Sequence, residues 1–75
     1  MQGLPKIVIY TKTGCPYCRT TMDDYRQRKV SFEEINLSLD SEAKAMVKSR
    51  YQATKVPLIV DDGNLVQIGD KNGNG

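Results

Sequence analysis

The chain has two cysteines, three positions apart at residues 15 and 18, and no histidine. A disulfide between neighbours this close removes little entropy from the unfolded chain, so it cannot stabilise a fold as the bridges of small secreted proteins do. A structural zinc site needs about four nitrogen or sulfur ligands, which one such pair does not supply. The pair therefore predicts redox chemistry, and the chain has to fold on its hydrophobic core.

That core is small, because a chain of 75 residues buries only roughly 60% of its unfolded surface. We expect one domain over residues 1–69 and a flexible tail over the Gly/Asn-rich residues 70–75. Eleven basic residues against nine acidic ones give a net charge of +2, without the dense basic patch of a nucleic-acid-binding protein. The apolar runs are too short to cross a membrane, and no signal sequence opens the chain. These features favour a cytoplasmic monomer that binds neither nucleic acid nor membrane.

The first half of the chain reads as strand, helix and strand. The β-branched run 6–10 predicts a buried strand, and Pro16 suits the first turn of a helix. An apolar face at helical spacing follows, formed by Cys18, Met22 and Tyr25. The segment 31–37 alternates between apolar and polar residues and predicts a half-buried strand.

The second half predicts a helix and a hairpin. The helix covers about 41–51, capped by Asp40 or Ser38. Two strands over 56–60 and 65–68 flank the Asp62-Gly63 dipeptide, which is a strong hairpin signal. The order β-α-β-α-β-β indicates an α/β fold with a mixed four-stranded sheet and helices packed on it. We expect its core to contain Tyr10, Tyr25, Phe32, Met46 and Val47.

Cys15 lies where the expected turn meets the start of the first helix. The unpaired N–H groups of a first helical turn and the helix dipole favour an anion at that point, and Lys12 and Arg19 add positive charge nearby. Cysteines in such places ionise readily, so we expect Cys15 to be the nucleophilic thiolate. Cys18 lies one turn further on and begins the apolar face, which makes it the more buried, resolving thiol.

The chemistry expected of this pair is thiol–disulfide exchange. The Cys15 thiolate attacks a substrate disulfide and forms a mixed disulfide, which Cys18 then resolves by attacking the Cys15 sulfur.

The run from Lys12 to Cys18 after a buried strand, with Val56-Pro57 before a hairpin, resembles the dithiol glutaredoxins of the CPYC type. The resemblance covers about residues 6–69. It implies a thioredoxin-like fold and an enzyme that reduces protein disulfides and glutathione mixed disulfides. Glutathione would be the reductant, no metal would be needed, and the role would be electron transport in cell redox homeostasis.

The resemblance also implies a role for individual residues. Lys12 would pair with a glutathione carboxylate, and Tyr17 would line the groove. Val56, before a cis Pro57, would offer its backbone N–H and C=O to the cysteinyl part of glutathione, as an added strand does. Asp70 would hold the amino group of the tripeptide.

This sequence departs from the family pattern at three places. Lys55 stands where the family usually has a threonine before Val-Pro. It is either a solvated cation or, if it points into the groove, a group that favours an anionic substrate. The stretch Gln67-Ile68-Gly69-Asp70 replaces a Gly-Gly pair and its acidic residue, and no C-terminal helix can form after it. The short ending resembles the glutaredoxin-like hydrogen donors of ribonucleotide reductase, which thioredoxin reductase reduces. A second alternative is a non-catalytic module that holds an iron–sulfur cluster between two chains, although such proteins typically have a single cysteine.

Overall fold

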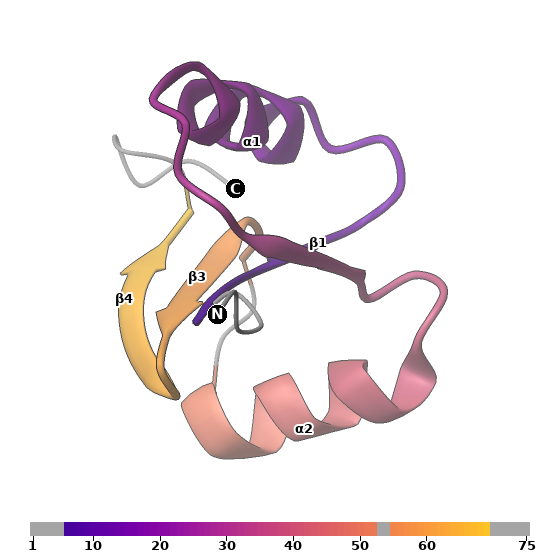
Figure 1. Cartoon of the computed structure of the whole chain (residues 1–75). Coiled ribbons are helices and arrows are strands. Elements are labelled where there is room, and N and C mark those ends of the chain that lie inside the picture. Colours follow the sequence, from indigo (N-terminus) through magenta and orange to yellow (C-terminus); the bar gives the residue numbers. More distant parts are fainter. Residues whose placement is uncertain (1–5, 53–54, 70–75) are drawn as a thin grey trace.

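The computed structural model describes residues 6–52 and 55–69. They form one four-stranded sheet and two helices, in the element order that the sequence predicts (Figure 1). The elements are β1 (Ile7–Thr11), α1 (Pro16–Gln27), β2 (Glu33–Asn36), α2 (Ser41–Tyr51), β3 (Leu58–Asp61) and β4 (Asn64–Ile68). The predicted tail over residues 70–75, and residues 1–5 of the predicted domain, lie outside the described residues.

The sheet has the strand order β2-β1-β3-β4 and is mixed. β1 pairs with β2 in parallel and with β3 antiparallel, and β3 and β4 form the predicted antiparallel hairpin. The hairpin turns at Asp62 and Gly63, whose φ angles are 53° and 83°. Two positive φ angles in succession are the geometry of the turn that Asp-Gly favours, because glycine has no Cβ to clash there.

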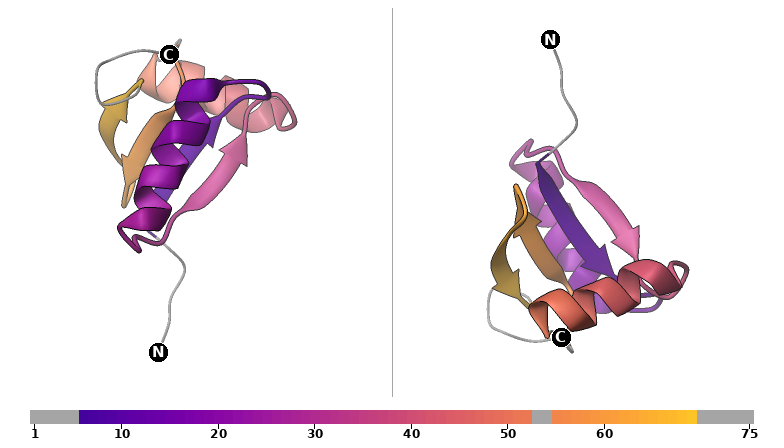
Figure 2. Two further views of the ribbon diagram at one scale, coloured as in Figure 1. Left: turned by 90° about the horizontal axis from the view of Figure 1, so that it is seen from above. Right: turned by 90° about the horizontal axis from the view of Figure 1, so that it is seen from below.

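The two helices cover opposite faces of the sheet (Figures 1 and 2). Because side chains alternate along a strand, Ile9 of β1 joins the core cluster that contains Cys18 and Met22 of α1. The next residue, Tyr10, joins the cluster that contains Val47 of α2. The fold is therefore a three-layer α/β/α arrangement in which β1 contributes to both halves of the core.

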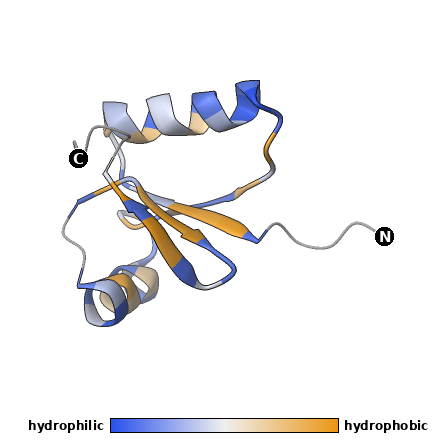
Figure 3. Ribbon diagram, turned by 90° about the vertical axis from the view of Figure 1, so that its left-hand side faces the viewer, coloured by the Kyte–Doolittle hydropathy of each residue, from blue (hydrophilic) through white to orange (hydrophobic). Residues whose placement is uncertain are grey.

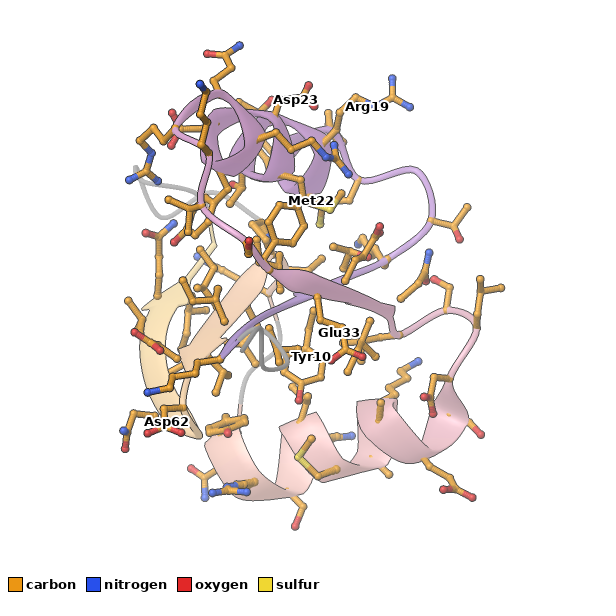
Figure 4. All side chains as sticks on the ribbon, viewed as in Figure 1. Tyr10, Arg19, Met22, Asp23, Glu33 and Asp62 are labelled. Atoms are coloured by element: carbon orange, nitrogen blue, oxygen red, sulfur yellow. The ribbon has the colours of Figure 1, made fainter. Side chains whose placement is uncertain are left out.

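Hydropathy follows this layering, with apolar residues concentrated on the strands and polar residues on the outer sides of the helices (Figure 3). Met22 points from α1 toward the sheet, whereas Asp23 points away from it (Figure 4). On α2 the buried positions recur every four residues, at Ala43, Val47 and Tyr51. Met46 lies beside this stripe and is 36% exposed, so its prediction as a core residue is wrong.

Helix starts and strand ends differ slightly from their predicted positions. Asp40, and not Ser38, caps α2: its carboxylate accepts a hydrogen bond from the Ala43 N–H at 2.9 Å. β3 begins at Leu58, since Pro57 has no N–H to donate to a neighbouring strand. Neither helix of the described ranges has the length and apolar character that crossing a membrane requires.

Candidate active site

The two cysteines lie at the N-terminal end of α1, with Cys15 as its N-cap and Pro16 at its first position. The backbone N–H of Cys18 points at the sulfur of Cys15, at 3.4 Å between N and Sγ. Both cysteines are free thiols, 9% exposed at Cys15 and 2% exposed at Cys18. The structure confirms that Cys18 is the more buried of the pair and that a first-turn amide faces the Cys15 sulfur.

Burial raises the pKa of the Cys18 thiol to about 12, and a hydrogen bond with Cys15 and the charge of Cys15 act in the same direction. Cys18 therefore keeps its proton at neutral pH. A thiol in this state does not attack external disulfides, because the thiolate is the nucleophile. The arrangement suits a resolving cysteine that reacts only after Cys15 has formed a bond.

The raised pKa of Cys18 predicts a loss of stability in alkaline solution. From the ordinary value of 9 up to about 12, the unfolded chain loses this proton while the folded chain keeps it, so rising pH favours unfolding. Burial also raises the pKa of Tyr10, which adds to the effect. In urea titrations at increasing pH, we expect the unfolding free energy of the Cys18→Ser variant to fall less across this window than that of the wild type. Equal slopes for the two proteins would contradict the prediction.

The segment before β3 lies against the cysteine pair. The Val56–Pro57 peptide bond is cis, as predicted, and both residues are buried. The Cys15 thiol donates to the Val56 carbonyl oxygen, with 3.9 Å between Sγ and O. A group bonded to the Cys15 sulfur would therefore lie beside the backbone of Val56.

Two cavities open beside this centre. The first, of about 610 Å³, is lined by both cysteines together with Thr11, Lys12, Arg19 and Glu34. The second, of about 350 Å³, has Val47 and Val56 in its wall and is surrounded by four lysines, namely Lys12, Lys44, Lys48 and Lys55. Lys12 belongs to both cavities. Among the described residues that line the second cavity there is no carboxylate to balance these charges.

The sequence analysis missed Lys44 and Lys48. Their spacing of four residues, each directly after a residue of the α2 stripe, was the available signal, since residues four apart share one helix face. The sequence did identify Lys12 and Lys55, and the structure brings both to the same cavity. Tyr17 is exposed and lines neither cavity, so its contact with a substrate stays a prediction. Asp70 lies outside the described residues.

A hydrogen-bonded connection, also missed, anchors the loop that precedes Cys15. The Thr13 N–H donates to the Ser38 hydroxyl at 3.1 Å, and the Asn36 amide donates to the Thr13 hydroxyl at 3.3 Å. The Ser38 N–H donates to Asn36 Oδ1 at 2.8 Å. These bonds tie the loop that contains Lys12 and Cys15 to the end of β2.

The described ranges contain no cluster of three or more His, Cys, Asp or Glu side chains placed to hold a metal ion. The site is a dithiol at a helix N-terminus that faces a cis-proline segment. Together with the sheet order and the two helices, this arrangement defines a protein of the thioredoxin-like fold with a dithiol site.

The chain belongs to the glutaredoxin family, whose sequence pattern it matches over residues 7–66. It is 34% identical over 56 residues to a glutaredoxin of Pseudomonas aeruginosa, covering 75% of this chain and 67% of the relative. It is 28% identical over 60 residues to an uncharacterised glutaredoxin-like 8.6 kDa protein encoded in the rubredoxin operon of Clostridium pasteurianum, covering 80% of each.

A solved structure agrees with this assignment. The thioredoxin-like protein BC3987 superposes with a TM-score of 0.75 at 30% identity, over 81% of this chain and 84% of that one. The chain spans 61–80% of the length of the curated relatives it matches. The family consists generally of thiol–disulfide oxidoreductases, and the predicted fold and family are confirmed.

Proposed function

We propose that this protein is a glutathione-linked thiol–disulfide oxidoreductase that reduces glutathione mixed disulfides and protein disulfides. The observation that carries the proposal is the position of the Cys15 sulfur, between the Cys18 N–H of the first helical turn and the Val56 carbonyl, with Cys18 buried behind it. Peptide donors directed at a sulfur stabilise its negative charge, and a second thiol one turn away is within reach for exchange.

The reaction consists of two exchanges. The Cys15 thiolate attacks one sulfur of the substrate disulfide, forms a mixed disulfide and releases the other sulfur as a thiolate. With a glutathione mixed disulfide, a second glutathione then attacks the Cys15-bound sulfur and regenerates the Cys15 thiolate. With a protein disulfide, Cys18 attacks Cys15 and leaves a Cys15–Cys18 disulfide, which two glutathione molecules reduce.

The cavity with four lysines supports an anionic thiol as the partner. Glutathione carries two carboxylates, and Lys12, Lys44, Lys48 and Lys55 surround the cavity that Val56 shares. Neither Lys44 nor Lys48 forms an ion pair within the described residues, so their charges are available to a ligand. The backbone of Val56 offers the hydrogen bonds of an added strand to the same molecule.

The reductant is tested by two coupled assays on one substrate. Turnover of a mixed disulfide between glutathione and a small thiol is followed through NADPH oxidation, first with glutathione and glutathione reductase, then with thioredoxin reductase alone. We expect turnover in the first assay. Turnover only in the second would overturn the link to glutathione and indicate a hydrogen donor that thioredoxin reductase reduces.

The four-lysine cavity makes a specific prediction about glutathione affinity. The double variant Lys44→Glu/Lys48→Glu replaces two attractive charges by two repulsive ones, and exposed charge pairs are worth about 0.2–1 kcal/mol each. We expect KM for glutathione to rise about tenfold with little change in kcat, measured in the glutathione reductase assay.

A matched control separates this effect from a general change in charge. Lys6→Glu/Lys29→Glu changes the net charge equally, but Lys6 precedes β1 and Lys29 follows the end of α1 that lies away from Cys15. Both variants make the same substitution at two exposed positions, so melting temperatures should be similar. If the control raises KM as much as the cavity variant, the lysines are not a binding site.

A further inference from the structure

A carboxylate lies on the face of the sheet that α1 covers. Side chains alternate along β1, so Thr11 points to the same face as Ile9, whose cluster contains Cys18 and Met22. The Thr11 side chain is only 1% exposed, and its hydroxyl donates to Glu34 Oε2 at 2.9 Å. Glu34 lies on the adjacent strand β2, opposite Ile9 in the register. Glu34 is itself exposed, and the buried hydroxyl gives its carboxylate a hydrogen-bond donor on the α1 face.

The neighbouring acidic residue shows that this placement is particular to Glu34. Glu33 precedes it on β2 and lies beside Tyr10, on the side of the sheet that faces α2 (Figure 4). Its negative charge contributes to raising the pKa of Tyr10. Two consecutive glutamates thus serve opposite faces, and only Glu34 shares a cavity with the cysteines.

That cavity connects the carboxylate with the dithiol. The cavity has a volume of about 610 Å³, and Thr11, Glu34 and both cysteines line it. One water occupies about 30 Å³ in the liquid. The cavity that Glu34 and Cys18 both line therefore has room for several waters. Glu34 is the one acidic side chain among the described residues that line the cavity, and Lys12 and Arg19 are its cations.

The resolving step needs a proton acceptor at this place. Cys18 has to become a thiolate in order to attack, yet burial raises its pKa far above neutrality. The Cys15 sulfur is no longer a base at that stage, because it is bonded to the substrate. Lys12 and Arg19 are protonated cations and have no site for a further proton.

We propose that Glu34, held by the Thr11 hydroxyl, accepts the Cys18 proton through water in this cavity during the resolving step. The Cys18 S–H bond breaks and its proton moves to the carboxylate. The Cys18 sulfur forms a bond to the Cys15 sulfur while the bond between Cys15 and the substrate sulfur breaks, and its electron pair leaves on the substrate thiolate. The protein is oxidised to the Cys15–Cys18 disulfide, and the substrate is reduced. The proposal rests on the dithiol mechanism above, and it makes Glu34 a group that acts only after Cys15.

The two chemical steps can be measured separately with 5,5′-dithiobis(2-nitrobenzoate). Attack by Cys15 of the fully reduced protein on this disulfide releases one thionitrobenzoate, and resolution by Cys18 releases the second. In stopped-flow absorbance, we expect Glu34→Gln to leave the first phase unchanged. The second phase should slow on the order of a hundredfold, the lower end of general-base effects.

The pH profile provides a readout that a structural defect would not move. Thr11 from β1 is hydrogen-bonded to Glu34, and the titratable and charged groups that line the same cavity are Lys12 and Cys15 from the loop and Cys18 and Arg19 from α1. The pH profile of the second phase should differ between wild type and Glu34→Gln, because only the wild type has a side chain at residue 34 that can accept a proton. Glu34→Asp should restore part of the rate. Thr11→Val, which removes the hydroxyl but keeps the shape, should slow the same phase by a smaller factor.

Glu33→Gln is the matched control, because it removes the same charge from the adjacent residue on the other face. We expect both phases to be unchanged in that variant. An unchanged second phase in Glu34→Gln, or an equal slowing of both phases, would overturn the proposal. A single phase in the wild type would contradict the dithiol mechanism itself, which makes the two failures distinguishable.

Discussion

Cys15→Ser is expected to abolish reduction of both glutathione mixed disulfides and protein disulfides. A serine hydroxyl at this position is not ionised, so neither substrate can form the first covalent bond. Removing a catalytic nucleophile costs on the order of a thousandfold or more in turnover. The measurement is the glutathione reductase assay with a small mixed disulfide, alongside reduction of a protein disulfide followed by thiol release.

Cys18→Ser is the informative comparison, because it removes only the resolving thiol. We expect it to keep activity on glutathione mixed disulfides, where glutathione resolves the intermediate, and to lose activity on protein disulfides. Turnover by Cys15→Ser, or loss of both activities in Cys18→Ser with an intact fold, would overturn the assignment of the two roles.

Leu58→Ala is expected to have the largest effect on stability. Leu58 is 0% exposed, at the centre of the cluster that joins the sheet to α2. Removing a buried leucine side chain costs about 2–5 kcal/mol, from lost burial and from the cavity left behind. In a domain of this size each kcal/mol corresponds to about 4–8 °C in melting temperature. Chemical denaturation and thermal melting followed by circular dichroism measure both quantities.

Leu65→Ala provides the control, since it makes the same chemical change one strand away. Leu65 is 40% exposed on β4, and substitutions at such positions usually change stability by about 0.5 kcal/mol or less. Similar losses for both variants would contradict the prediction that burial of Leu58 is the cause of its larger effect.

The parts of this protein that could be predicted from its sequence are those with a local signal. Pro16 at a helix start, the Asp62-Gly63 turn and the β-branched run of β1 each carry their own steric reason, and the structure places all three as expected. The greater burial of Cys18 than of Cys15 is equally local, because Cys15 caps the helix and Cys18 begins its apolar face one turn later. Met46 shows the limit of such reasoning, since helical spacing alone does not tell the middle of a buried stripe from its margin.

The remaining features depend on contacts between distant segments. Whether Glu33 or Glu34 faces α1 is decided by the register of β2 against β1, and a shift of one residue would exchange them. The gathering of Lys12, Lys44 and Lys55 around one cavity depends on how α2 crosses the sheet. The sequence predicted Lys12 and Lys55 as substrate-binding residues, but their meeting with Lys44 at one cavity, like the placement of Glu34, depends on the three-dimensional arrangement.

Lys12 lines two cavities, one that contains both cysteines and one that contains Val56 but neither cysteine. A molecule bound beside Val56 would fill the second cavity and leave the first, which borders both cysteines, to water. Under the mechanism proposed above, the Cys15–Cys18 bond would then form with water still present beside the two sulfurs.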